Sequence, residues 1–330
     1  MRDKTTIPAK LQPGDTVRVV APSHSLALIS EDVRQIATKR LESLGLVVTF
    51  GKHVEEEDEF ISSSIASRVA DLHEAFADPK VKAIFTVIGG FNCNQLLPHL
   101  DWELIKNNPK IFIGYSDTTA LQNAMLARAN LATYSGPAYS TFGQKLHFDY
   151  TLDHFKKCLF EVDSFYLLPS KEWTDDTWYI NQDDRHPVSN TGYWTINQGE
   201  AEGVIVGGNL STVQLLQGTS HFPPTDNIIL FLEDDDESQY FHFDRQFESL
   251  LQSIPIKNIR GIVFGRFQKK STITRPNLET LIRIRPQLAD IPIIANADFG
   301  HTSPMITFPI GGSVRIIARE NKAEIKIIKH

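Results

Sequence analysis

Cysteine is scarce in this sequence, which has only Cys93 and Cys158 among 330 residues. Two cysteines in a chain of this length imply no disulfide framework, so a reducing compartment, the cytoplasm, is the expected location. Apolar segments long enough for a signal peptide or a membrane span are also missing. Residues 1–12 are polar and the longest apolar runs have the length of strands, so we expect no membrane partner.

Positive charge is in the minority. The 33 Lys and Arg residues face 40 Asp and Glu residues, which gives a formal net charge of −7, and no basic block is interleaved with aromatic residues. Nucleic acid is therefore not expected as a partner. The spacings His-x-x-x-His and Cys-x-x-Cys do not occur, and the acidic run 234–236 alone does not make an EF-hand loop. We expect neither a metal nor another cofactor.

The composition that remains is that of a folded globular protein, with 41% hydrophobic and 22% charged residues, and the length suffices for two domains. In the first half, short β-branched runs alternate with helical patterns. Such alternation predicts βαβ units and a parallel sheet, hence an N-terminal Rossmann-like α/β domain over residues 1–165. The expected strands are 17–20, 46–50, 83–88 and 111–114, and the expected helices are 31–44, 65–77, 94–100 and 117–129.

The middle of the chain breaks this pattern. Residues 146–198, rich in aromatic and polar side chains and holding three of the four tryptophans, predict a linker and a long loop, with the Trp-rich part at 166–200. These tryptophans either face a partner or pack at a domain interface, and the sequence leaves both open. Beyond them, the pattern predicts a strand-rich C-terminal α/β domain over residues 201–330. Its expected helix is 210–217, and its expected strands are 203–208, 228–232, 261–264, 291–295, 314–318 and 323–328.

A serine marks the point where the expected strand 111–114 turns into a helix. Ser116 can expose its Oγ there at the carboxyl edge of the sheet, beside the free N–H groups and positive dipole of a helix N-terminus. The order Gly-Tyr-Ser-Asp resembles a nucleophile elbow but lacks the second glycine of Gly-x-Ser-x-Gly. This segment alone therefore favours the alternative that Ser116 or Asp117 is only a helix N-cap.

Two glycine turns also follow expected strands. Gly89 and Gly90 let the backbone approach a ligand closely, and an N–H here can combine with that of Asp117 into a two-donor oxyanion hole. A plain turn is the alternative. The second turn, Gly207-Gly208-Asn209, opens a helix without the lysine of a phosphate-binding loop, so Asn209 is either ligand-lining or structural.

A carboxylate and an imidazole follow strands of the second half. Glu233 stands where the strand 228–232 ends, and His301 lies in the loop after the strand 291–295. A nucleophilic serine needs a base, and that imidazole needs a carboxylate to fix its tautomer and stabilise its cation. Glu233 and His301 fit these two roles, although for any single one of 11 histidines a surface or hydrogen-bonded loop position is the simpler interpretation.

Six segments in this order make the chain resemble a family of serine peptidases that comprises the LD-carboxypeptidases and the microcin C self-immunity proteins. Each segment is weak evidence alone, and all six together are specific. The resemblance covers nearly the whole chain. The segments are Leu11-Gln12-Pro13-Gly14-Asp15 leading into Val19-Val20-Ala21-Pro22-Ser23, then Gly89-Gly90, Ile113-Gly114-Tyr115-Ser116-Asp117, Gly207-Gly208-Asn209-Leu210, Leu232-Glu233-Asp234 and Phe299-Gly300-His301.

This resemblance implies a serine peptidase whose nucleophile, carboxylate and base are Ser116, Glu233 and His301. The nucleophile would belong to the N-terminal domain and the other two to the C-terminal domain, so the active site would lie between the domains. The resemblance also implies an oxyanion hole from N–H groups near Gly90 and at Asp117. Members of the family are usually homodimers, and we expect a homodimer here.

Two substrate classes compete within the family. LD-carboxypeptidases remove a terminal D-alanine from murein tetrapeptides, whereas the microcin immunity proteins cut the bond that joins a C-terminal aspartate to a modified adenylate. The Trp-rich stretch resembles the immunity branch, whose long loop can stack an aromatic side chain on the nucleobase. We therefore expect an aminoacyl-nucleotide substrate, with Asn209, Trp173 and Trp178 as candidate binding residues, and a small peptide as the alternative.

A hypothesis from another class is a non-catalytic module that binds a small ligand between two α/β domains. Such a module would need neither Ser116 nor His301. The fold alone does not choose between an enzyme and a binding module.

Overall fold

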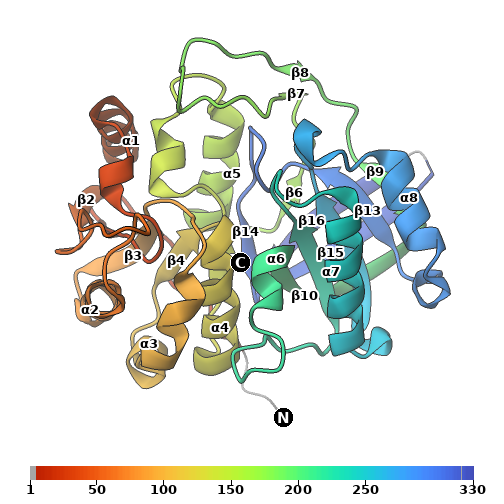
Figure 1. The fold of residues 1–330 in the computed structure, drawn as a ribbon, viewed down its shortest axis with the longest axis horizontal. Coiled ribbons are helices and arrows are strands. Elements are labelled where there is room, and N and C mark those ends of the chain that lie inside the picture. The colour runs from red at the N-terminus through yellow and green to blue at the C-terminus, as the bar shows by residue number, and fades with distance from the viewer. Residues whose placement is uncertain (1–4, 321) are drawn as a thin grey trace.

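The computed structural model describes residues 5–320 and 322–330. Two large sheets stand side by side, the first built mainly from the N-terminal half and the second from the C-terminal half (Figure 1). The chain between residues 168 and 193, called the strap, runs across the top of the view above both sheets and carries a short antiparallel pair, β7 (Glu172–Trp173) and β8 (Val188–Ser189).

The first sheet has six strands in the order β14-β5-β4-β3-β1-β2, all parallel except β14 at one edge. Successive residues of its central strand serve opposite faces, since Ile111 and Ile113 belong to one core and Phe112 to the other. This pattern is typical of a parallel sheet covered on both faces. The strands are β1 (Thr16–Val20), β2 (Val47–Phe50), β3 (Val81–Thr86), β4 (Ile111–Gly114), β5 (Thr133–Ser135) and β14 (Phe308–Ile310).

Helices cover both faces of the first sheet. The apolar sides of α1 and α5 pack on one face, and those of α2, α3 and α4 pack on the other. Local capping fixes two of the starts, because Ser64 and Asp101 accept hydrogen bonds from backbone N–H groups of the first turns of α2 and α3. The helices are α1 (Glu31–Ser43), α2 (Ile65–Ala77), α3 (Trp102–Asn107), α4 (Thr119–Ala129) and α5 (Asp149–Leu159).

The second sheet has eight strands in the order β6-β16-β15-β10-β11-β12-β13-β9. Its centre, β10 to β13, is parallel, and the strands on both sides of it are antiparallel. Within the described ranges, no helix combines the length and the apolar character needed to cross a membrane. The elements are β6 (Phe165–Leu167), β9 (Trp194–Asn197), β10 (Gly199–Asn209), α6 (Leu210–Gln214), β11 (Ile228–Glu233), α7 (Tyr240–Ser253), β12 (Ile259–Gly265), α8 (Arg275–Arg283), β13 (Ile293–Ala297), β15 (Ser313–Arg319) and β16 (Lys322–Lys329).

The C-terminal part of the chain contributes to both sheets. After β13 the chain passes through His301, joins the first sheet as β14 beside β5, and returns to the second sheet as β15. His301 therefore lies on a segment that connects the two sheets. The domain limits expected at residues 165 and 201 stay a prediction.

The predicted fold class is confirmed, with a parallel first sheet and a strand-rich second sheet. The expectation of a linker and loop throughout 146–198 is wrong. Part of this stretch is helix α5, which buries Thr151, Phe155 and Cys158 on one face, and β6 and β9 belong to the second sheet. The i, i+4, i+7 spacing of these residues carried the helical signal, and the surrounding polar residues obscured it.

Smaller differences concern single elements. The expected helix 94–100 is a 3-10 helix, because Pro98 inside it offers no N–H to an α-helical ladder. The expected strand 291–295 begins and ends two residues later, and α7, α8, β5 and β14 were not expected. The 3-10 helices are Leu26–Leu28, Cys93–His99, Ser116–Thr118, Tyr139–Gly143, Ile256–Asn258, Lys269–Ser271 and Pro286–Leu288.

Candidate active site

The residues singled out in the sequence lie at the carboxyl ends of parallel strands. Ser116 follows β4 and the Gly89-Gly90 turn follows the neighbouring β3, both in the first sheet. In the second sheet, Glu233 ends β11, directly beside the last residue of β10, and His301 follows β13. Parallel strands place their carboxyl ends at one edge of a sheet, which is where ligands bind in such folds.

Ser116 adopts a strained backbone conformation. Its φ angle is +62°, in the left-handed region, which costs a residue with a side chain about 1–3 kcal/mol. The preceding Tyr115 is extended, and helical structure begins at Ser116 itself. The abrupt change from strand to helix presents the serine hydroxyl at the edge of the sheet.

A row of hydrogen bonds joins Ser116, His301 and Glu233. His301 Nε2 lies 3.0 Å from Ser116 Oγ, and His301 Nδ1 lies 2.8 Å from Glu233 Oε2. A carboxylate only accepts, so Nδ1 carries a proton toward Glu233, and Nε2 of the neutral ring faces the serine hydroxyl as an acceptor. The Glu233 side chain is 3% exposed and that of His301 17% exposed, so solvent reaches the base but hardly the carboxylate. This arrangement can take a proton from the serine.

Negative charge dominates the surroundings of His301. Burial lowers its pKa, but the Glu233 carboxylate outweighs burial, and with Asp234 and Asp235 it raises the pKa of His301 to about 9. Burial, together with the neighbouring carboxylates of Glu233 and Asp235, raises the pKa of Asp234 to about 6. The positive imidazolium that forms when His301 accepts a proton is therefore strongly stabilised.

Two glycines make room for the Glu233 side chain. A Cβ on Gly300 would lie 2.7 Å from Glu233 Oε2, and a Cβ on Gly265 would lie 2.9 Å from Glu233 Cβ. Gly300 also has a φ of +104°, which residues with a side chain rarely adopt. The Glu233 side chain therefore occupies space that a side chain at residue 265 or 300 would fill.

The Gly89-Gly90 turn lies against the serine. A Cβ on Gly89 would lie 3.0 Å from Ser116 Oγ and 3.6 Å from the N atom of Asp117. The space between the hydroxyl and the Asp117 amide is thus open only because residue 89 has no side chain. Gly90, with a φ of +152°, is equally close-packed, since a Cβ there would collide with Ser23 and His24.

The Asp117 side chain does not cap a helix. Its hydrogen bonds hold the backbone of the same residue in place. Its buried Oδ2 accepts hydrogen bonds from Ser23 Oγ at 2.6 Å and from Cys93 N at 2.9 Å. Neither Ser116 nor Asp117 is the N-cap of α4, a position held by Thr118. The N-cap alternative raised by the sequence is therefore wrong, and the two extra bonds fix the direction of the Asp117 amide.

Both polar atoms of the Asn209 side chain contact other protein groups. Its side-chain oxygen accepts from Thr212 N, and its Nδ2 donates to Asp234 Oδ1 at 3.0 Å. Ser211 Oγ lies 2.7 Å from Asn209 Oδ1 and 3.0 Å from Asp234 Oδ1, so it can donate its proton to either oxygen. Asn209 thus starts α6 and holds the Asp234 carboxylate beside Glu233, and its role in substrate binding stays a prediction.

The strap holds the two candidate tryptophans in different surroundings. The Trp173 ring is 5.1 Å from the Arg266 guanidinium and 5.1 Å from Lys269 Nζ. Trp178 is half-buried against the core of the first sheet, beside the 64% exposed Tyr179. The strap is tied to the chain beyond His301 by two backbone hydrogen bonds between Thr174 and Ser303, of 2.7 and 2.8 Å. Contact of either tryptophan with a ligand stays a prediction.

The sequence matches one family in both of its parts. Residues 17–136 match the LD-carboxypeptidase N-terminal domain, and residues 202–316 match the LD-carboxypeptidase C-terminal domain. The chain belongs to the LD-carboxypeptidase family of serine peptidases. The resemblance inferred from the six sequence segments is confirmed.

Relatives within the LD-carboxypeptidase family span nearly the whole chain. The putative carboxypeptidase YocD of Bacillus subtilis is 48% identical over 98% of this chain and 99% of its own. The probable murein peptide carboxypeptidase of the same organism is 32% identical over 97% of this chain and 94% of its own. The microcin C7 self-immunity protein MccF of Escherichia coli is 32% identical over 93% of this chain and 92% of its own.

Solved structures show the same fold. An MccF-like protein from Bacillus anthracis superposes with a TM-score of 0.97 at 50% identity and covers 98% of this chain and 100% of that one. MccF in complex with aspartyl sulfamoyl adenosine superposes with a TM-score of 0.89 at 29% identity, covering 98% of this chain and 99% of that one.

Several residues that surround this site had no role in the sequence-based prediction. Ser23 lies in one of the six segments that carry the resemblance but was assigned no role. Gly265, Arg266 and Asp298 were assigned none either. Gly265 and Arg266 directly follow an expected buried strand, and Asp298 lies between another expected strand and His301. Their positions just after strands could therefore have marked them as candidate site residues. Among residues 5–320 and 322–330, no three His, Cys, Asp or Glu side chains are placed to hold a metal ion.

Proposed function

We propose that this member of the LD-carboxypeptidase family is a serine carboxypeptidase or amidohydrolase that uses Ser116, His301 and Glu233 as nucleophile, base and orienting carboxylate. The observation that carries the proposal is the hydrogen-bonded row of these three side chains, 3.0 and 2.8 Å long. A serine at an elbow, an imidazole and a buried carboxylate in this order are the parts that acyl transfer requires.

The proposed reaction proceeds through an acyl-enzyme. His301 Nε2 takes the proton of Ser116 Oγ as the oxygen attacks the substrate carbonyl, and the oxyanion that forms accepts hydrogen bonds from the backbone N–H groups at Gly90 and Asp117. His301 then gives the proton to the leaving nitrogen. A water molecule, deprotonated by His301, attacks the ester carbonyl and releases the acid, and Ser116 regains its proton.

For the substrate, we propose a C-terminal acidic aminoacyl group joined to a modified adenylate. The relative MccF is a microcin C7 self-immunity protein, and its solved structures include the complex with aspartyl sulfamoyl adenosine. Trp173 and Trp178 lie on the strap that joins the chain near His301, and an aromatic side chain there can stack on a nucleobase. The second candidate is a terminal D-alanine of a murein tetrapeptide, which the 32% identical murein peptide carboxypeptidase favours.

A side-by-side hydrolysis assay tests both substrates. The purified protein, Ser116→Ala and the control Ser43→Ala, which lacks a hydroxyl exposed at the end of α1, receive aspartyl sulfamoyl adenosine or a murein tetrapeptide. Cleavage of the nucleotide by wild type and Ser43→Ala, but not by Ser116→Ala, is the expected result. Cleavage of the tetrapeptide alone would assign the protein to the murein branch.

The binding-module alternative has its own readout. A fluorophosphonate reacts covalently with an activated serine whatever the natural substrate is. We expect wild type to be labelled and Ser116→Ala to stay unlabelled. A wild-type protein that neither reacts with the probe nor cleaves either substrate would be a binding module.

Assembly and location belong to the same proposal. We propose a homodimer in the cytoplasm, and light scattering of the purified protein together with fractionation of cells that express it checks both points.

A further inference from the structure

We infer that Asp298, held by Arg266, Ser170 and Tyr150, is the positioning residue that keeps His301 in line with Ser116. This inference rests on the proposed function, in which His301 is the base. These four residues are called the Asp298 clamp below. None of them belongs to the hydrogen-bonded row itself.

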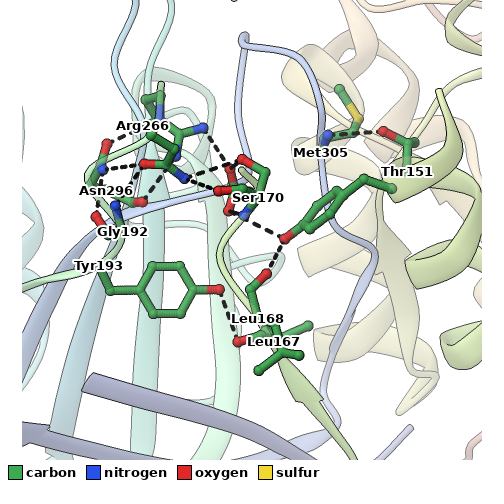
Figure 2. A network of polar contacts seen from close by, with 12 residues as sticks. Thr151, Leu167, Leu168, Ser170, Gly192, Tyr193, Arg266, Asn296 and Met305 are labelled. Atoms are coloured by element: carbon green, nitrogen blue, oxygen red, sulfur yellow. Dashed lines mark hydrogen bonds and ion pairs between the residues drawn. The ribbon is translucent and has the colours of Figure 1, made fainter. Parts of the chain in front are cut away.

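The Asp298 carboxylate is saturated with hydrogen bonds. Its Oδ1 accepts from Arg266 Nη1 at 2.6 Å and from Ser170 Oγ at 2.6 Å. Its Oδ2 accepts from Ser170 N at 2.9 Å. Tyr150 OH lies 3.2 Å from Oδ2 and 2.5 Å from Leu168 O, so its one proton is shared between these two acceptors. Asp298 is 0% exposed and Arg266 2% exposed, so this ion pair is closed to solvent. Figure 2 shows this network, with Arg266 and Ser170 on facing segments.

The clamp joins segments from both halves of the molecule. Arg266 directly follows β12 of the second sheet, Ser170 opens the strap, and Tyr150 belongs to α5, which packs on the first sheet. The backbone around Asp298 is held as well. Arg266 N donates to the carbonyl oxygens of Ala297 and Phe299, and Ile306 N donates to that of Asp298. The loop is therefore fixed relative to both sheets at this point.

Little chain separates this fixed point from the base. Only Phe299 and Gly300 lie between Asp298 and His301, and the Phe299 ring stacks on Phe231 of β11, 5.5 Å between centroids. Because Glu233 ends that same strand, the clamp sets where the imidazole approaches both of its partners. A misplacement of about 1 Å can cost a catalytic group about a hundredfold in rate.

The contacts of Arg266 argue against a role in binding substrate. Its Nε donates to Asn296 Oδ1 at 3.0 Å, its Nη1 is taken by Asp298, and the Trp173 ring lies 5.1 Å from the guanidinium. Buried ion pairs add little net stability, because the cost of removing both charges from water offsets their attraction. The Arg266–Asp298 pair therefore has little value for stability, and placing the His301 loop gives it a function.

Removal of single hydroxyl donors tests the inference without leaving a buried charge unpaired. Ser170→Ala and Tyr150→Phe each delete one hydrogen bond to Asp298. Ser170→Ala also removes the acceptor of Asn190 Nδ2, and Tyr150→Phe also removes the donor to Leu168 O. The matched control is Tyr139→Phe, which removes a hydroxyl that donates to the carbonyl oxygen of Arg34 in α1. The readout is the rate of Ser116 labelling by a fluorophosphonate as a function of pH, which needs no knowledge of the substrate. Thermal unfolding of each variant is measured in parallel.

We expect both clamp variants to be labelled about tenfold more slowly, and the pH of half-maximal labelling to fall. The pH shift follows because His301 faces Glu233, Asp234 and Asp235 from the second sheet and Tyr115 from the first. A ring that moves away from the carboxylates is easier to deprotonate. The control Tyr139→Phe is expected to keep both the rate and the pH dependence of wild type.

Two results would overturn the inference while leaving the proposed function intact. One is wild-type labelling by both clamp variants. The other is slower labelling with an unchanged pH dependence and a lowered melting temperature, since a partly unfolded population reduces the rate without moving the titration of His301. Failure of the wild-type protein itself to react with the probe would instead remove the proposed function, and the positioning role with it.

Discussion

The two sheets contribute to the candidate active site in different physical ways. The first sheet contributes backbone shape: a strained Ser116 with a φ of +62° and a Gly89 that leaves the space in front of the hydroxyl open. The second sheet contributes buried charge: Glu233 beside Gly265 and Gly300, a His301 whose pKa is raised to about 9, and the Arg266–Asp298 ion pair. Activity should therefore suffer most from a change of side-chain size in the part of the site on the first sheet. In the part on the second sheet, it should suffer most from a change of charge.

The largest effect is expected at the nucleophile. Ser116→Ala should lower kcat by about a million-fold, because serine, base and carboxylate act as one unit. Ser116→Gly should be equally inactive but more stable than Ser116→Ala by about 1 kcal/mol, since glycine adopts a positive φ without strain. Urea unfolding of the two variants measures the difference. Equal stability would show that the backbone at this position is not strained in solution.

Removal of the buried charge comes next. Glu233→Gln should lower kcat/KM by about 10,000-fold, because the imidazole loses its orienting acceptor. In the proposed mechanism neutral His301 is the base, so activity is expected to rise with pH up to the pKa of His301. The missing carboxylate lowers that pKa, and the acidic limb of the kcat/KM profile should therefore move to lower pH. A kcat/KM profile with a lower maximum but an unchanged pH of half-maximal activity would contradict the pairing of Glu233 with His301.

The same pair should make stability depend on pH. The folded pKa of His301, about 9, lies above its ordinary value, about 6.5. Protonation of His301 thus stabilises the fold fully below about pH 6.5, and this contribution is lost as the pH rises through about 9. Unfolding free energies of wild type and Glu233→Gln between these pH values should converge toward the alkaline end. If the unfolding free energies of the two proteins changed in parallel with pH, Glu233 would not be the group that raises the pKa of His301.

A smaller loss is expected from a change of shape in the first half. The Cβ of Gly89→Ala would lie 3.0 Å from Ser116 Oγ, in the space between the hydroxyl and the Asp117 amide. We expect kcat to fall about 100-fold to 1,000-fold, as when one oxyanion donor is lost, with the far-ultraviolet circular dichroism spectrum unchanged. Full activity of this variant would place the oxyanion elsewhere.

The smallest effect is expected on the strap. If Trp178 stacks on a nucleobase, Trp178→Ala should raise KM for aspartyl sulfamoyl adenosine about tenfold, the usual loss for one stacked base, and leave kcat nearly unchanged. The murein tetrapeptide, which has no base, is the control substrate. Equal changes for both substrates would mean that Trp178 only packs against the first sheet.

Local signals in the sequence predicted most strands and the chemistry at their ends. Buried β-branched runs predicted the parallel strands of both sheets except β5, and glycine turns marked the places where the backbone approaches other atoms closely. Helix α5 was hidden because its buried face includes the polar residues Thr151 and His154, which weaken the apolar pattern. Strand β14 was hidden because its three residues, Phe308–Ile310, are too few to show a period, and only β5 gives them a partner.

By itself, the sequence determined the fold class and the residue types at the strand ends, because strand, glycine turn and helix start are set by neighbours along the chain. Only the tertiary structure decided that three of these residues meet. His301 is 185 residues from Ser116 and 68 from Glu233 in the chain, and their hydrogen bonds depend on how the two sheets lie side by side (Figure 1). The Asp298 clamp likewise exists only after α5, the strap and β12 have come together, since no single segment holds more than one part of it.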